Sequence, residues 1–342
     1  MTKMRILLIQ LRRLGDLVLT TPAITALRHH FPRGHLALAV TSDCEPLLPA
    51  IRQVDQTFVF KRGVRDLIVS RKLRASGFDC VIDFTRNDRS ASLALLSGAP
   101  QRIVTDRLRR KSPVRARVYT EFADCAMPKM HTVDYNLALL HPLGISGAPA
   151  EPILQLPPYA ADAAAALIQR ELGEQPFAIF HPGSTRAEKF WEPDRWAKAM
   201  AFAKNELELQ PVITSGNSPL EHAHITQIQS HARIPVIDLT ARLDLLTLTA
   251  LIARARLLVT VDSAPMHLAS AVKTPQVILF GPTNPFHWRP RTSPAAILFG
   301  AAREPLQQYQ PRAPTLPMNQ ISTAAVIDAM RSMHTAPAAS AV

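Results

Sequence analysis

The chain has 342 residues, of which 47% are hydrophobic and 19% charged, and its formal net charge is +12. This length suffices for two domains, and the composition is that of a globular protein and not of a disordered one. No apolar run approaches the ~18 residues of a membrane helix, and the first residues lead into a strand without a signal-peptide pattern. Three widely spaced cysteines are expected to be reduced packing residues, without a disulfide or metal cluster: Cys44, Cys80 and Cys125.

Apolar strands and amphipathic helices alternate along the first half of the chain. We expect strands at 5–11, 35–41, 57–60 and 78–84, and helices at 17–31, 65–75, 90–96 and 130–143. Asn87 or Asp88 is expected to cap the third helix. This rhythm predicts a parallel sheet with helices on both faces. The loop 12–16 has one glycine, Gly15, and lacks the G-x-G-x-x-G fingerprint, so a nicotinamide cofactor is not indicated.

A segment rich in Gly, Pro and Ala, residues 144–158, is the best candidate for an interdomain linker. After it the rhythm restarts, with strands expected at 177–181, 211–214, 236–239, 257–261 and 276–280 and an edge strand at 296–299. Helices are expected at 160–172, 193–205, 219–231 and 245–254. We therefore predict domains at 1–150 and 151–320, then a closing helix and disordered tail at 321–342.

Residues 102–117 are strongly basic, with seven cations against Asp106: Arg102, Arg107, Arg109, Arg110, Lys111, Arg115 and Arg117. Such a patch attracts nucleic acid, an anionic membrane face or a phosphorylated glycolipid, or it is a solvated loop. Aromatic residues do not interleave with the arginines and no nucleic-acid motif is present, so no nucleic-acid partner is expected.

The segment 257–291 reads as strand, helix and strand, with polar loops at the carboxyl ends of both strands. Asp262 and Ser263 follow the first strand, and Pro265 fits the first turn of the helix. Ligands of open α/β sheets bind at that edge, where the helix N-terminus offers free N–H groups and a positive dipole end. The segment therefore predicts a site for an anionic ligand.

Three motifs in order resemble glycosyltransferase family 9, the lipopolysaccharide heptosyltransferases. They are RILLIQLRRLGDLVLTTPAI near the start, FHPGSTRAEKFWEPDRWAKAM in the middle and VTVDSAPMHLASAVKTPQVILFGPTNP near the end. The following FHWRPR is most similar to the heptosyltransferase III branch. The resemblance spans nearly the whole chain.

The resemblance implies a GT-B fold, in which two Rossmann-like β/α/β domains face each other across a cleft. It implies an inverting transfer of heptose from ADP-heptose to an inner-core lipopolysaccharide sugar, with no metal and no cofactor. We expect a cytoplasmic enzyme at the inner face of the cytoplasmic membrane, with its basic first half near anionic lipid. Two rival hypotheses are a transferase for another nucleotide sugar and a catalytically silent glycolipid-binding protein.

By the same resemblance, Asp16 is the general base that takes the proton of the acceptor hydroxyl. A helix N-cap is the alternative role, and both can hold at once. Lys189 is implied to neutralise the leaving diphosphate, or else it is a solvated loop cation. Further donors come from the same loop: Ser184, Thr185 and Arg186.

The rest of the implied donor site follows the later strands: Gly216, Glu221, Asp262, Ser263, Ala264 and His267, with Thr283 and Asn284 as further candidates. Glu221 would bind ribose hydroxyls, or it is an ordinary first-turn helix acid. His267 would face the diphosphate, or it is a packed core histidine. Many family members carry Thr-Gly where this chain has Ser263-Ala264. The phosphates and carboxylates of the acceptor would meet four arginines of the first half: Arg62, Arg65, Arg86 and Arg89.

Overall fold

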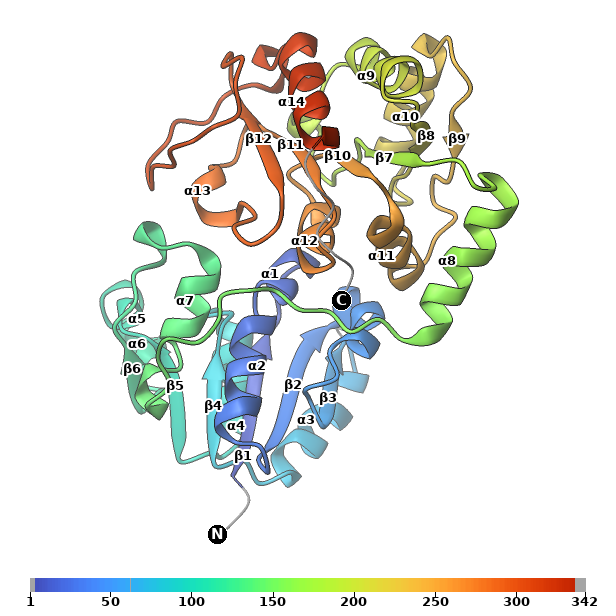
Figure 1. Ribbon diagram of the computed structural model, residues 1–342. Helices are drawn as coiled ribbons and strands as arrows, with labels where there is room; N and C mark the ends of the chain where they lie inside the picture. Colours follow the sequence, from blue (N-terminus) through green and yellow to red (C-terminus); the bar gives the residue numbers. More distant parts are fainter. Residues whose placement is uncertain (1–3, 62, 336–342) are drawn as a thin grey trace. The chain divides into compact units, whose positions relative to one another are not determined.

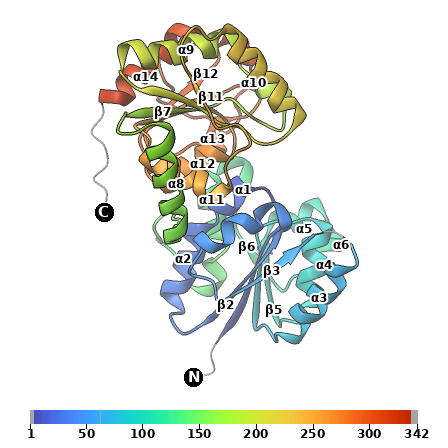
Figure 2. The same cartoon turned by 90° about the vertical axis from the view of Figure 1, so that its right-hand side faces the viewer.

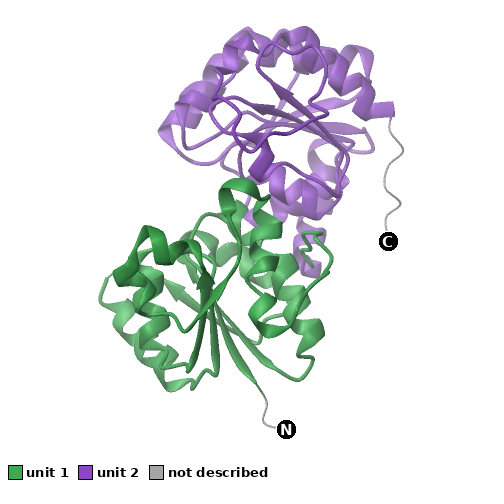
Figure 3. Ribbon diagram, turned by 90° about the vertical axis from the view of Figure 1, so that its left-hand side faces the viewer, with its two compact units in different colours: residues 1–155 green, residues 156–342 purple. Residues whose placement is uncertain are grey.

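The computed structural model describes residues 4–61 and 63–335. The chain divides into two compact units, Met1–Gln155 and Leu156–Val342, at a point inside the predicted linker. Figure 1 labels their helices and strands, and Figure 3 shows each unit in its own colour. Each unit contains a six-stranded sheet whose neighbouring strands are all parallel. This confirms the predicted α/β class with two Rossmann-like units.

The sheet of unit 1 has the order β3-β2-β1-β4-β5-β6. Its strands are β1 (Arg5–Gln10), β2 (His35–Thr41), β3 (Gln56–Phe60), β4 (Cys80–Asp83), β5 (Gln101–Thr105) and β6 (Glu121–Ala123). One face is covered by α2 (Thr21–His30) and α7 (Thr132–Ala138), and the other by α3 (Arg65–Ala75), α4 (Asp88–Leu96) and α5 (Arg107–Lys111), followed by α6 (Pro113–Ala116) (Figure 2). Because both faces are covered, the central strands are buried along almost their whole length and read as continuous apolar runs.

The sheet of unit 2 has the order β12-β11-β10-β7-β8-β9. Its strands are β7 (Phe177–His181), β8 (Gln210–Ile213), β9 (Ile237–Asp238), β10 (Leu257–Val261), β11 (Gln276–Phe280) and the edge strand β12 (Ala295–Phe299). The main core lies between the sheet and three helices: α9 (Pro193–Glu206), α10 (Pro219–His231) and α14 (Thr323–Thr335). The opposite face carries α8 (Pro158–Glu171), α11 (Leu245–Arg254) and α12 (Ala264–Ala271). The short α13 (Pro285–Trp288) follows β11.

The predicted first helix, 17–31, is wrong, because the structure has two helices there, α1 (Leu14–Val18) and α2. Pro22 has no N–H to donate to the Val18 carbonyl. The Thr21 hydroxyl donates a hydrogen bond to that carbonyl instead, at 2.7 Å. The Thr20 hydroxyl likewise bonds the Asp16 carbonyl at 2.7 Å. These side-chain bonds end the first helix and start the second.

Other boundaries also differ from the prediction. The predicted helix 130–143 is α7 followed by a separate 3-10 turn, His141–Leu143, which contains Pro142. The basic segment is not an open loop, because it forms β5, α5 and α6. The three cysteines are free and buried, as predicted. The predicted disordered tail, 336–342, lies outside the described residues. In the described part of the chain, no helix is both long and apolar enough to cross a bilayer.

Candidate functional site

In unit 2, the polar loops meet where β7 and β10 lie side by side, with Thr260 opposite His181. The helices that follow these strands, α9 and α12, lie on opposite faces of the sheet. Such a topological switch point opens a crevice at the carboxyl ends of the strands, which is where α/β sheets bind ligands. The predicted donor residues lie on the loops around this point.

Lys189 and Asp262 form an ion pair across this switch point. The Lys189 ammonium lies 2.6 Å from Asp262 Oδ2 and donates to the Asp262 carbonyl at 2.7 Å. The two side chains are 11% and 10% exposed, so the alternative of a solvated loop cation is wrong. The Thr283 hydroxyl donates to the same carboxylate oxygen at 2.5 Å. Three loops, after β7, β10 and β11, are thereby held together by one carboxylate.

The N-terminus of α12 lies beside this ion pair. Ser263 is the N-cap residue, with extended backbone and no side-chain capping bond, and Ala264 is the first helical residue. The first amides of a helix have no partner within the helix and carry its positive dipole end. Asp262, Ser263 and Ala264 thus place a carboxylate, a hydroxyl and free amides next to the Lys189 ammonium.

His267, one turn into α12, is buried, and burial lowers its pKa to about 4 despite the nearby Asp262 carboxylate. The imidazole is therefore neutral near pH 7. A neutral imidazole can still donate one hydrogen bond.

Glu221 lies in the first turn of α10, as the helix-acid alternative has it, but its side chain is buried. Its carboxylate accepts hydrogen bonds from the Ser218 hydroxyl at 2.7 Å and from the Gly216 amide at 3.3 Å. A side chain at Gly216 or Gly183 would collide with this carboxylate. The two glycines therefore leave the space that Glu221 fills, which ties the loops after β7 and β8 to one acid.

The other predicted residues of the β7 loop differ in their surroundings. Ser184 is buried, and its oxygen accepts a hydrogen bond from the Arg186 amide at 3.3 Å. Thr185 is exposed. The Arg186 guanidinium pairs with Glu188 at 2.6 Å, so this cation is already neutralised by a carboxylate on its own loop. Among the described residues of this loop, Lys189 is the one whose side chain hydrogen-bonds to the β10 loop.

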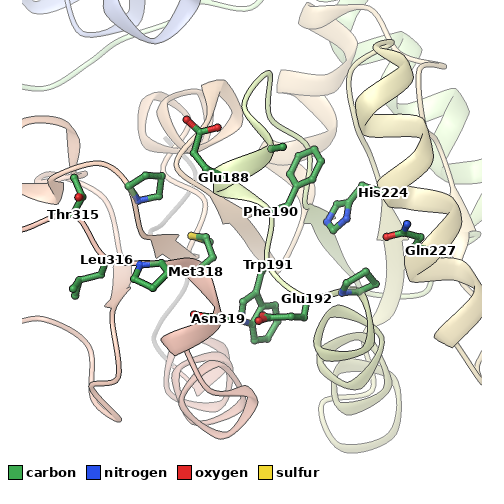
Figure 4. Close-up of a pocket in the computed structure, with 14 residues that line it drawn as sticks. Glu188, Phe190, Trp191, Glu192, His224, Gln227, Thr315, Leu316, Met318 and Asn319 are labelled. Carbon is green, nitrogen blue, oxygen red and sulfur yellow. The ribbon is translucent and has the colours of Figure 1, made fainter.

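A pocket of about 670 Å³ lies behind the same loop (Figure 4). Phe190, Trp191 and Glu192 line it together with residues from α10 and from the segment 315–319. Phe190 stacks on His224 with ring centroids 4.2 Å apart. The Lys189–Asp262 pair is not among the lining residues. The pocket is thus a neighbour of the switch point, and the predicted donor residues lie outside it.

Unit 1 repeats the arrangement at the switch point between β1 and β4, whose following helices α2 and α4 lie on opposite faces. The Leu11 amide donates to the Thr85 hydroxyl at 2.7 Å, so the two loops touch. Asp16 lies in the first turn of α1, and Arg13 is the N-cap residue. The alternative that Asp16 is the N-cap is therefore wrong, although its carboxylate accepts a hydrogen bond from the Arg13 amide.

The Asp16 side chain is only partly exposed. Desolvation by burial raises the pKa of this carboxyl above its usual value, against the opposing effect of the Arg12, Arg13 and Arg86 guanidiniums. A carboxylate with a raised pKa is a stronger base than an ordinary aspartate, and its guanidinium neighbours favour its ionised form.

The four arginines predicted to bind the acceptor do not share one environment. Arg86 has a positive φ of 65°, and its guanidinium lies 4.6 Å from the centroid of the Tyr135 ring. Arg89 pairs with Asp66 at 2.6 Å, and Arg65 is exposed on α3. Arg62 lies outside the described residues. The structure therefore brings Arg86 to the switch point and places Arg65 and Arg89 near α3.

One residue that the sequence analysis did not select organises this loop. Asp83, the last residue of β4, is fully buried and accepts hydrogen bonds from four donors. These are the amides of Thr85 and Arg86 and the hydroxyls of Ser90 and Tyr119, at 2.5–3.0 Å. The sequence did carry a signal for this role, since Asp83 ends an apolar strand. A carboxylate buried at such a position requires several hydrogen-bond donors around it. Asp83 thereby fixes the backbone that presents Arg86.

Comparisons with known proteins give a consistent result. The model of glycosyltransferase family 9 (heptosyltransferase) matches residues 67–315, well over half of the chain. Lipopolysaccharide heptosyltransferase 3 of Escherichia coli K12 is 29% identical over 293 residues, which cover 81% of this chain and 83% of that protein. The match to the family model begins after Asp16.

Solved structures show the same fold. The glycosyl transferase family 9 structure from Veillonella parvula superposes with a TM-score of 0.82 at 24% identity, over 97% of both chains. The E. coli ADP-heptose lipopolysaccharide heptosyltransferase II structure superposes with a TM-score of 0.78 at 21% identity, over 97% of this chain and 98% of that one. These likenesses confirm the GT-B class. The chain belongs to glycosyltransferase family 9, the heptosyltransferases.

Proposed function

We propose that this protein transfers heptose from ADP-heptose to an inner-core sugar of lipopolysaccharide, with inversion at the anomeric carbon. The observation that carries the proposal is the ion pair of Lys189 and Asp262 beside the α12 N-terminus, at a switch point of a family 9 chain. Sequence relatives named as lipopolysaccharide heptosyltransferases support this choice of donor and acceptor.

In this proposal, the diphosphate of the donor lies on the free amides of Ser263 and Ala264, close to the Lys189 ammonium. An anion is favoured there by the helix dipole and by the cation. As the bond between the anomeric carbon and the diphosphate breaks, the electron pair leaves with ADP and negative charge grows on the phosphate. Lys189 and the α12 amides stabilise that growing charge, which lowers the barrier.

Glu221 is proposed to accept hydrogen bonds from ribose hydroxyls. Its buried carboxylate has two protein donors, the Ser218 hydroxyl and the Gly216 amide, and a carboxylate has about four acceptor positions. Capacity therefore remains for further donors. Neutral His267 is proposed to donate one hydrogen bond to the donor diphosphate.

Asp16 is proposed to be the general base. The acceptor oxygen attacks the anomeric carbon from the side opposite the diphosphate, and its proton passes to the Asp16 carboxylate. The raised pKa of Asp16 brings this carboxyl closer to the working pH, where proton transfer is most efficient. The reaction then needs no metal and no cofactor, because cations and amides of the chain bind the leaving group.

Arg65, Arg86 and Arg89 are proposed to bind phosphate and carboxylate groups of the acceptor, as expected from the fork geometry of arginine. We further propose that the enzyme works in the cytoplasm, at the inner face of the cytoplasmic membrane, where the lipid-linked acceptor is found. A net charge of +12 favours contact with anionic lipid.

The test is turnover with purified protein and a lipopolysaccharide acceptor, in separate reactions with ADP-heptose and with UDP-sugars. We expect release of ADP from ADP-heptose only. Asp16→Asn should lower kcat by at least about a hundredfold and leave the donor Kd unchanged, because general-base catalysis contributes roughly 10²–10⁴. Turnover with a UDP-sugar supports the alternative donor, and donor binding without turnover supports a silent binding protein. Unchanged turnover in Asp16→Asn refutes the role of this base.

A further inference from the structure

The large apolar side chains exposed on unit 1 gather on one face of its sheet. Among the described residues they lie on α3, α4 and α6 or next to them: Val64, Leu67, Ile68, Leu95, Leu96 and Val114. Val64 and Val114 are 79% and 76% exposed. The helices that cover the opposite face, α2 and α7, contribute none of this group. We call the outer surface of α3, α4, α5 and α6 the α3–α6 face (Figure 2).

Helix α3 has apolar side chains on two sides, because Leu73 and Val69 pack on the core of unit 1 while Leu67 and Ile68 face outward. Leu73 is the buried residue of α3, whereas Leu67 and Ile68 are 62% and 54% exposed. Val64, Leu67 and Ile68 lie on one stripe of a helix, because they are spaced by three and four. Large apolar side chains on an outward stripe mark a surface that another apolar phase covers.

Cations surround these apolar side chains. The exposed ones on α3 and on the α5–α6 segment are Arg65, Arg71, Lys72, Arg74, Arg109, Arg110, Lys111 and Arg117. Two acids of this face are already neutralised, since Asp66 pairs with Arg89 and Asp88 pairs with Arg115. These pairs also link the starts of α3 and α4, and of α4 and α6. The α3–α6 face is therefore strongly positive.

We propose that the α3–α6 face docks on the surface of an anionic lipid bilayer, with Leu67, Ile68 and the other exposed apolar side chains inserted among the lipids. Interfacial helices combine apolar side chains with a rim of Lys and Arg in this way, and each cation near an anionic leaflet adds to the attraction. A second copy of this chain is a poorer occupant, because the cores of protein interfaces are depleted in lysine and charge, and two positive faces repel. This inference rests on the proposed function for its biological setting, and vesicle binding tests it separately.

The experiment is sedimentation of the full-length protein with vesicles of phosphatidylcholine alone or with one third phosphatidylglycerol. We expect binding to the anionic vesicles that falls with added salt, and little binding to the neutral ones. Leu67→Ser/Ile68→Ser should weaken binding by about tenfold or more, because two apolar side chains lose their transfer into lipid. Arg110→Gln/Lys111→Gln should weaken it by a similar factor and flatten the salt dependence.

Two matched controls keep the test specific. Leu220→Ser removes a leucine of unit 2 that is 42% exposed, and Arg254→Gln/Arg303→Gln removes two exposed cations of unit 2. Both should bind vesicles like the original protein. Equal binding by Leu67→Ser/Ile68→Ser and the original protein overturns the proposal. A dimeric mass in solution that the same variant lowers to that of a monomer also overturns it, in favour of a second copy.

Failure of the proposed function is distinguishable from failure of this inference. Transfer to an acceptor oligosaccharide freed of its lipid should be unchanged in Leu67→Ser/Ile68→Ser. Vesicle binding without heptose transfer would refute the proposed function and leave the docking surface standing. Heptose transfer without vesicle binding would refute the docking surface alone.

Discussion

Replacing Lys189 with methionine leaves the Asp262 carboxylate almost fully buried, with the Thr283 hydroxyl as its remaining side-chain donor among the described residues. Breaking a buried ion pair by removing one partner costs about 3–5 kcal/mol, because the other charge stays desolvated. The Thr283 bond keeps Asp262 partly satisfied, so we expect the lower end, roughly 3 kcal/mol. For a unit of this size, that is a fall in Tm of roughly 6–12 °C.

A double-mutant cycle separates the ion pair from other effects of the substitution. Asp262→Asn removes the opposite charge and keeps an oxygen for the Thr283 hydroxyl. If the two charges stabilise each other, Lys189→Met/Asp262→Asn should cost less than the sum of the single changes, by about 1–3 kcal/mol. The pair of Lys198 and Asp194, 62% and 44% exposed at 2.8 Å, is the matched control. Lys198→Met should cost less than about 1 kcal/mol.

Unfolding in urea followed by tryptophan fluorescence is the suitable assay. The three tryptophans are all in unit 2, and two of them are fully buried: Trp191, Trp196 and Trp288. The signal therefore reports the unit that holds the ion pair. A free energy of unfolding for Lys189→Met within about 0.5 kcal/mol of the original protein would refute the reasoning, as would strict additivity in the cycle.

The remaining predictions concern Glu221 and the buried histidines. Gly216→Ala would place a Cβ 2.7 Å from the Glu221 carboxylate and displace it. The KM for the donor should rise about tenfold, which corresponds to the loss of roughly one hydrogen bond, while Tm changes little. An unchanged KM contradicts this prediction. Burial lowers the pKa of three histidines of unit 2 to about 4: His181, His224 and His267. Unit 2 should therefore lose stability as the pH falls from 6.5 toward 4, because over this range only the unfolded state binds protons at these histidines. An unfolding midpoint in urea that is equal at pH 7 and pH 5 contradicts this prediction.

Local sequence determined many elements of this protein. The bounds of β7, β10 and β11 match the prediction residue for residue, as do those of α3, α10 and α11. These elements are short apolar runs between polar loops, or helices with proline or a capping residue at the start, so the information lies within a few residues. The position of the polar loops at the carboxyl edge of each sheet was also predictable, because it follows from the order of strand, loop and helix along the chain.

The sequence-based prediction missed helix ends that side-chain hydrogen bonds set, and it missed very short elements. The break between α1 and α2 comes from hydroxyl bonds of Thr20 and Thr21 combined with the missing amide of Pro22. The three-residue strand β6 has too few residues to show a pattern. The basic composition of residues 107–117 hid two short helices, because charge dominates that segment.

Tertiary structure alone decided the chemistry of the side chains. Lys189 and Asp262 are 73 positions apart, and they meet because β7 and β10 are neighbours in the sheet. Asp83 collects donors from up to 36 positions away. The sequence by itself determined which residue types stand at strand ends. Only the folded sheet decided which of them are buried, paired or shifted in pKa, because those properties depend on neighbours that sequence spacing does not reveal.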